Sequence, residues 1–519
     1  MKLKVLLISL ISLCCTVPAQ SATTNMKTEV SKKEVSTTVV NTALGQVKGV
    51  VENGIAEFRS VPYAVNPFEG TRRFQAPEKV QPWHGVLDAT RYKAPVPQPD
   101  RGKETVLLGA PGDLTLNILA PVKTAKKLPV MVWIPGGAFI RENASDAMYR
   151  GESFVRDGVI VVTVNYRVGI DGFMHIPGAP DNRGILDQIA ALEWVQSHIA
   201  SFGGDPEQVT LAGQSAGAEC VAILSGIPRT KGLFRRVIMQ SSPVQTVTLA
   251  QSERVAQTVG KLLGIKPTTE NLARVPFAEL VKAVVQTGKE IKDRSQWGMM
   301  SWGGTAFLPV IDQSLLTGTL TGNLAHHADP SVSVLIGSTE QESRLYLVPN
   351  GQIDKVHMSD SLQLIHDLNM DADIIKTYKK GNPTVGDVYA ALLSDYTFRM
   401  PTQHIAQTLV NHGNAVWVYD FAWRSPAFNN RLGAAHLVDV PFAFDTTEAP
   451  KSKVFLGDHP PQSLIRDMHT TWVRFIQTGQ AGWSVYQSQE RRVMRFDGQS
   501  AEVKDPGKAI RLLWESYPF

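Results

Sequence analysis

The pentapeptide Gly213-Gln214-Ser215-Ala216-Gly217 places a serine between small residues in the pattern G-x-S-x-G. A strand-like segment, Val209 to Ala212, precedes it, and a helix-compatible run, Ala218 to Leu224, follows it. In such a strand–turn–helix the tight turn strains the backbone at the serine and exposes its Oγ, while small neighbours let the helix and the strand approach closely. This context favours Ser215 as a nucleophile over a plain tight turn.

A serine hydroxyl does not attack at neutral pH unless a histidine takes its proton and a carboxylate orients that histidine. Where a nucleophilic serine sits in this kind of turn, the acid follows it in the chain and the histidine comes last. Glu340 and Glu342 come directly after the predicted strand Val332 to Ile336, and His436 ends a polar loop after a later strand. We expect Glu342 as the acid, with Glu340 as the alternative.

Two further carboxylates near the histidine, Asp439 and Asp445, are also candidates for the acid. A carboxylate at the end of its own strand suits the geometry better, so these two rank behind the glutamates.

The segment Pro135-Gly136-Gly137-Ala138 follows another predicted strand and contains the small residues that let backbone N–H groups converge on a developing oxyanion. The N–H of Ala216, at the start of the helix after the serine, points toward the same place. We therefore expect Gly137, Ala138 and Ala216 to form an oxyanion hole.

The sequence pattern of the segments that position these residues predicts buried strands alternating with helices. Several candidates are continuous β-branched runs, which are typical of the central strands of a mostly parallel sheet. They lie at 115–119, 130–134, 159–165, 208–212, 236–240, 332–336 and 416–421. A hairpin is predicted at Asn53-Gly54, a helix over 184–200, and helical inserts over 249–305 and 341–412 that cap one end of the sheet.

The N-terminus has the features of a secretory signal peptide. Lys2 and Lys4 precede the apolar run Val5 to Cys15, which is too short for a membrane span, and a cleavage site is expected near 19–22. We expect residues 1–22 to be the signal, 23–40 a disordered lead-in, and 41–519 one α/β domain, secreted or periplasmic. Cys220 would then be the only cysteine, so no intramolecular disulfide is expected.

Charge and histidine content point away from other partners. The formal net charge is only +4, without a basic cluster interleaved with aromatic residues, so we expect no nucleic acid partner. His326-His327 lacks acidic or cysteine ligands at matching spacing, so we expect no metal.

Further motifs are spread along the chain at 58–64 (FRSVPYA), 83–90 (WHGVLDAT), 165–169 (NYRVG), 182–188 (NRGILDQ), 202–206 (FGGDP), 239–243 (MQSSP) and 436–442 (HLVDVPF). With these, the chain from about Thr42 to nearly the C-terminus resembles the type-B carboxylesterase and cholinesterase family of α/β hydrolases. The resemblance implies the α/β-hydrolase fold, with a mostly parallel central sheet and helices on both faces. It also implies hydrolysis of small-molecule esters through an acyl-enzyme, with no cofactor.

Carried over by position, the resemblance implies Ser215 as nucleophile, His436 as base and Glu342 as acid, with Gly137, Ala138 and Ala216 as oxyanion donors. The chain departs from the family at Ala138, where a glycine is usual, and at Gln214, where a glutamate is usual.

The loop from Pro95 to Asp113 has no tryptophan to hold a cation, which argues against a choline site. Two alternatives remain open: a lipase or polyester hydrolase that acts at interfaces, and a catalytically inactive binding protein, since this family includes such members.

Overall fold

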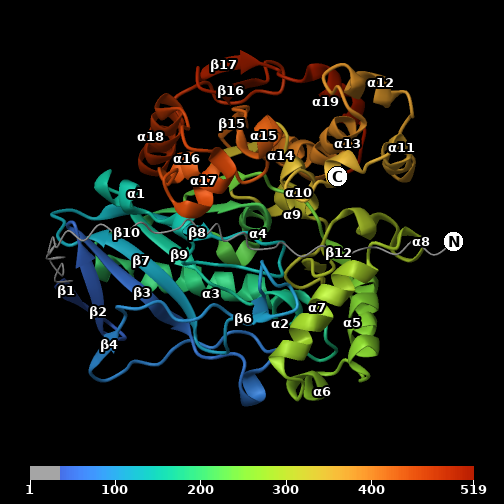
Figure 1. Ribbon diagram of the computed structural model, residues 1–519. Helices are drawn as coiled ribbons and strands as arrows, with labels where there is room; N and C mark the ends of the chain where they lie inside the picture. The colour runs from blue at the N-terminus through green and yellow to red at the C-terminus, as the bar shows by residue number, and fades with distance from the viewer. Residues whose placement is uncertain (1–35) are drawn as a thin grey trace, which may run out of the picture. The chain divides into compact units, whose positions relative to one another are not determined.

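A 13-stranded mixed sheet runs through the computed structural model, which describes residues 36–519 (Figure 1). The expected signal peptide lies outside the described residues. Along the sheet the strand order is β1-β2-β3-β7-β9-β8-β10-β11-β14-β15-β16-β17, with β4 paired to β2. The strands are β1 Ser36–Thr42, β2 Gly45–Glu52, β3 Ile55–Ala64, β4 Val86–Asp88, β7 Leu114–Pro121, β8 Leu128–Ile134, β9 Ile160–Val164, β10 Gly204–Gln214, β11 Arg236–Gln240, β14 Ser333–Thr339, β15 Val416–Phe421, β16 Arg492–Phe496 and β17 Ala501–Lys504.

The centre of this sheet, from β9 through β8, β10, β11, β14 and β15 to β16, is parallel. All residues of β9 and of β11 are buried, which explains why these strands read as continuous apolar runs. All seven buried strands expected from the sequence are present, as is the hairpin of β2 and β3 around Asn53 and Gly54, both at positive φ. The predicted fold class is confirmed.

The N-terminal boundary differs from the expectation. Ser36 to Val40 were expected in a disordered lead-in, but they belong to β1, which pairs antiparallel with β2 from Ser36↔Val51 to Thr42↔Gly45. Thr and Val residues with strong strand preference fill this segment, and the edge of β2 offers them hydrogen-bond partners.

Helices cover both faces of the sheet, and β8 shows how alternate side chains meet them. Val130, Val132 and Ile134 belong to one hydrophobic cluster, together with residues of α3 and α4, whereas Met131 and Trp133 belong to a second one, together with residues of α18. The larger helices are α3 Arg183–His198, α4 Ala216–Ser225, α5 Leu249–Leu263, α7 Phe277–Glu290, α9 Leu320–His327, α11 Met358–Asp367, α13 Val385–Ser394, α14 Met400–His412 and α18 Gln462–Thr478.

Shorter helical segments complete the fold: α1 Glu152–Arg156, α2 Gly169–Phe173, α6 Thr269–Ala273, α8 Arg294–Trp297, α10 Arg344–Leu347, α12 Ile374–Lys379, α15 Ala427–Asn430, α16 Val440–Phe444, α17 Pro450–Leu456 and α19 Lys508–Trp514. The two predicted inserts contain α5 to α8 and α10 to α14; in Figure 1, α5 to α7 lie at the lower right and α11 to α13 at the upper right. A π-helix, Asp395–Arg399, joins α13 to α14.

A buried ion pair accounts for two of the sequence motifs. The Arg167 guanidinium donates from Nε and Nη2 to the two carboxylate oxygens of Asp187, at 2.8 and 2.7 Å. Both side chains are almost fully buried, so removing either partner would leave an uncompensated charge. The pair ties the start of α3 to the loop after β9.

Candidate active site

Ser215 lies in the strained turn that the sequence predicts. It links β10 to α4 with φ 59° and ψ −131°, and its N–H donates to the Gln240 carbonyl at 2.9 Å. A Cβ added to Gly213 would lie 2.5 Å from the backbone of Gly217, and one added to Gly217 would lie 2.1 Å from the Ile134 oxygen. Only glycine fits at either position, which is the physical basis of the motif.

His436 and Glu342 form a buried pair. The Nδ1 atom of His436 is hydrogen-bonded to Glu342 Oε2, and the His436 N–H donates to the Glu342 carbonyl at 3.1 Å. The other carboxylate oxygen of Glu342 accepts from the Thr339 N–H at 2.7 Å. Because a carboxylate only accepts, Nδ1 carries the proton and Nε2 keeps a lone pair, which is the tautomer that a general base needs.

The alternative acids have other partners. Glu340 binds Arg424 at 2.7 Å and Arg495 at 3.1 Å, and Asp445 accepts from Ser153 Oγ at 2.8 Å. Asp439 accepts from Gln240 Nε2 at 2.9 Å and from the Tyr419 hydroxyl at 3.0 Å.

Burial is the main cause that raises the pKa of Asp439, to about 6. Of the four carboxylates, only Glu342 is hydrogen-bonded to the His436 ring within the described chain.

The turn after β8 lies against the serine. A Cβ on Gly136 would lie 2.4 Å from the Gln214 oxygen and 3.0 Å from Ser215 Cβ. Gly137 has φ 150° and Ala138 φ 55°. Among residues 36–519, neither of their N–H groups has an acceptor, and the Ala216 N–H opens α4, where first-turn donors lack intrahelical partners. These three donors are free to bind an oxyanion.

The family resemblance implies a glycine at position 138, where this chain has alanine, and the backbone φ at this position explains that preference. A left-handed φ costs an alanine about 1–2 kcal/mol, whereas glycine adopts it freely. The Ala138 side chain is exposed, so its methyl group meets no steric obstacle.

Two aromatic residues pack on the His436 ring, and neither was expected from the sequence. The Phe398 ring centroid lies 4.4 Å from that of His436, and the Tyr346 centroid 5.8 Å from it. The Tyr346 side chain as a whole is 47 % exposed, while burial of its hydroxyl and the charge of Glu342 raise the pKa of the phenol. The position of Tyr346, four residues after Glu342, was the one available signal; Phe398 lies in the π-helix, far from any motif.

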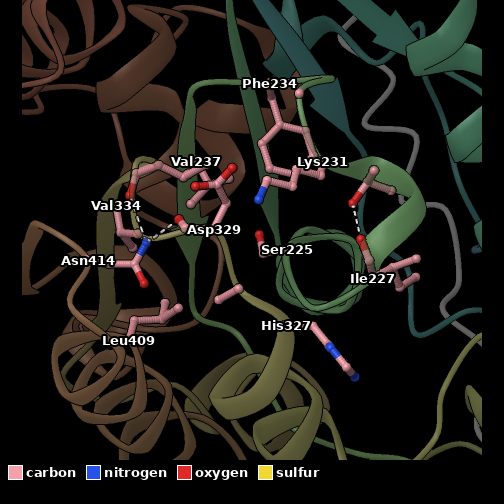
Figure 2. A pocket seen from close by; sticks show the side chains of 14 residues that line it. Ser225, Ile227, Lys231, Phe234, Val237, His327, Asp329, Val334, Leu409 and Asn414 are labelled. Atoms are coloured by element: carbon pink, nitrogen blue, oxygen red, sulfur yellow. Dashed lines mark hydrogen bonds between the residues drawn. The ribbon is translucent and has the colours of Figure 1, made fainter.

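Two cavities away from the Ser215 turn differ in size. The cavity shown in Figure 2 lies at the far end of α4, beside Ser225 and Asn414, and its volume of about 20 Å³ holds roughly one water molecule. A larger cavity of about 210 Å³ is lined by residues of both inserts, among them Met299, Met300 and Tyr396.

Over residues 36–519, no cluster of three metal-ligating side chains occurs, His326 and His327 included. In the same range, no helix is long and apolar enough to cross a membrane.

The chain is similar to known proteins over most of its length. The model of the family described as "Carboxylesterase family" matches residues 36–512. The chain is 33 % identical to a para-nitrobenzyl esterase of Bacillus subtilis over 497 residues, covering 90 % of this chain and 96 % of the relative. It is 28 % identical to an acetylcholinesterase of Bungarus fasciatus, covering 92 % and 86 %. A solved carboxylesterase of Geobacillus stearothermophilus superposes with a TM-score of 0.82 at 29 % identity, covering 92 % of this chain and 99 % of that one.

Proposed function

This chain belongs to the carboxylesterase family and is a carboxylic ester hydrolase, and from that premise we propose that it acts through an acyl-enzyme on Ser215. The observation that carries the proposal is the buried His436–Glu342 pair, whose other ring nitrogen, Nε2, lies 2.9 Å from Gln214, the residue directly before the serine. His436 is the base in this mechanism, and Glu342 is the acid that orients it.

In the first half-reaction Ser215 Oγ attacks the ester carbonyl carbon while its proton passes to His436 Nε2. The carbonyl oxygen becomes an oxyanion, which accepts from the N–H groups of Gly137, Ala138 and Ala216. The tetrahedral intermediate then breaks its bond to the alcohol, and the imidazolium gives its proton to the leaving oxygen. Glu342 stays ionised and stabilises the imidazolium throughout.

In the second half-reaction a water molecule attacks the acyl-serine and gives its proton to the same nitrogen. The acid leaves, and the proton returns to Ser215 Oγ. Both halves use only side chains and N–H groups of this chain.

The test is a rapid-mixing experiment with p-nitrophenyl acetate. We expect a burst of one p-nitrophenol per enzyme, and acetyl-Ser215 in the peptide map of quenched enzyme. Ser215→Ala should lose the burst and several orders of magnitude in kcat while it stays folded. A burst that survives in the alanine variant would place the acyl group elsewhere.

For the substrate class, we propose neutral esters rather than choline esters. Gln214 is uncharged, and the loop from Pro95 to Asp113 contributes no tryptophan but does contribute Arg101, whose positive charge acts on the Tyr346 hydroxyl beside the serine. Butyrylcholine and its uncharged analogue 3,3-dimethylbutyl butyrate compare the two classes at equal size. A kcat/KM at least about tenfold higher for the choline ester would reverse this assignment.

We also propose that the protein is exported, on the signal-like composition of residues 1–22. Cell fractionation with N-terminal sequencing of the mature protein tests this. An intact Met1 on cytoplasmic enzyme would contradict it.

A further inference from the structure

The base in this site has an unexpected partner. Gln214 Nε2 lies 2.9 Å from His436 Nε2, the nitrogen that has to accept the serine proton. Both side chains are buried, with 2 % and 3 % of their surface exposed. Gln214 is the last residue of β10, directly before Ser215.

The direction of this hydrogen bond follows from the tautomer. Since Nδ1 donates its proton to Glu342, Nε2 is an acceptor, and the amide N–H of Gln214 donates to it. An imidazole nitrogen has one lone pair in the ring plane, so it serves one donor well. Within the described chain no hydrogen bond joins Ser215 Oγ to the ring.

The ring has little freedom to change partners by itself. Glu342 holds it at Nδ1, and Phe398 and Tyr346 pack on it. A productive arrangement therefore needs the Gln214 amide to leave Nε2 and the Ser215 hydroxyl to turn toward it.

We propose that Gln214 is a positioning residue that caps the base in the resting enzyme, so that substrate must displace its amide before His436 can take the Ser215 proton. The inference rests on the proposed function, because displacing the Gln214 amide adds to the activation free energy of the first step of that mechanism. A side chain without an N–H donor at position 214 leaves Nε2 free for the serine and speeds acylation.

Two variants remove the donor in different ways. Gln214→Met keeps the length of the side chain, whereas Gln214→Leu shortens it; both are apolar and carry no charge. A net hydrogen bond of this kind corresponds to about two- to tenfold in a rate. In single-turnover experiments with p-nitrophenyl acetate, we expect both variants to acylate faster than wild type by about that factor, with the increase in the acylation rate constant and not in substrate affinity.

Gln188→Met is the matched control. Gln188 is another fully buried glutamine, on α3, and its amide donates to Cys220 Sγ at 3.3 Å rather than to the base. Its acylation rate constant should equal that of wild type, and thermal unfolding of all three variants checks the fold.

Acylation that is unchanged or slower in Gln214→Met and Gln214→Leu would overturn the inference. An increase in only one of them would also overturn it, since it would trace the effect to side-chain shape and not to the donor. The wild-type burst keeps this result separate from the proposed function: a missing burst refutes the acyl-enzyme, whereas a normal burst with slower variants refutes only the role of Gln214.

Discussion

At the scale of single residues, the acid is the position where two neighbours compete and their surroundings decide. Glu342 is fully buried and bonded to His436, while Glu340 is held by two arginines at the surface. We expect Glu342→Gln to lower kcat by about 10⁴, because the tautomer and the imidazolium lose their support. Glu340→Gln should change kcat less than about tenfold, since the Glu340 carboxylate is bonded to Arg424 and Arg495 and not to His436.

Steady-state kinetics with an activated ester, with circular dichroism to check the fold, compares the two glutamates. The opposite ranking would make Glu340 the acid.

Ala138 allows the oxyanion turn to be tested at one residue. Because its φ is 55°, Ala138→Gly should relieve about 1 kcal/mol of strain and keep the activity. Ala138→Pro removes the N–H and cannot adopt that φ, so kcat should fall by roughly 10²–10³. A proline variant with full activity would show that the third donor lies elsewhere.

At the scale of elements, the site depends on how closely the helix after the serine approaches β8. Gly217→Ala would push a methyl group to 2.1 Å from the Ile134 carbonyl oxygen, so α4 has to move. We expect a loss of about 1–3 kcal/mol in the free energy of unfolding and a fall in kcat/KM, since the same movement displaces Ser215.

The control for that variant is Gly288→Ala, in the last turn of α7, where an added Cβ meets nothing within 4 Å. It should leave kcat/KM unchanged and stabilise the helix. Denaturant unfolding and ester kinetics on both variants separate packing at the serine from a general effect of alanine. Equal kinetics in the two variants would contradict the role of the close approach.

The buried strands and the turn at Ser215 could be predicted from the sequence, because the residues that cause each of them are neighbours in the chain. Continuous Val and Ile runs mark strands buried on both faces, and Gly213 and Gly217 mark the tight turn. The contacts of Gln214, Tyr346 and Phe398 with His436 could not be predicted, since they depend on side chains brought together from distant segments. The start of β1 was missed because a polar stretch became a strand by pairing with β2.

At the scale of the whole molecule, one buried carboxyl couples stability to pH. Glu142 follows the oxyanion turn, is 3 % exposed, and accepts from the Ala144 N–H at 3.1 Å. Burial raises its pKa from the ordinary 4.5 to about 8. The folded protein therefore holds a proton that the unfolded chain releases, and its stability falls as the pH rises through that window.

Glu142→Gln removes this group, so we expect the decline in Tm between pH 5 and pH 8 to flatten relative to wild type. Differential scanning calorimetry across that range measures it. Parallel curves for the two proteins would mean that Glu142 titrates normally.

The residues of the site are far apart in the chain, so the ribosome synthesises them at different times. Gln214 and Ser215 precede their histidine by more than 200 residues, and Glu342 precedes it by 94. Synthesis runs from the N-terminus, so a nascent chain carries the serine turn long before β15 and the loop that ends in His436 exist. In the proposed mechanism, hydrolysis thus begins only when translation of the chain is nearly finished, and a truncated product that stops before His436 has the proposed nucleophile without its base.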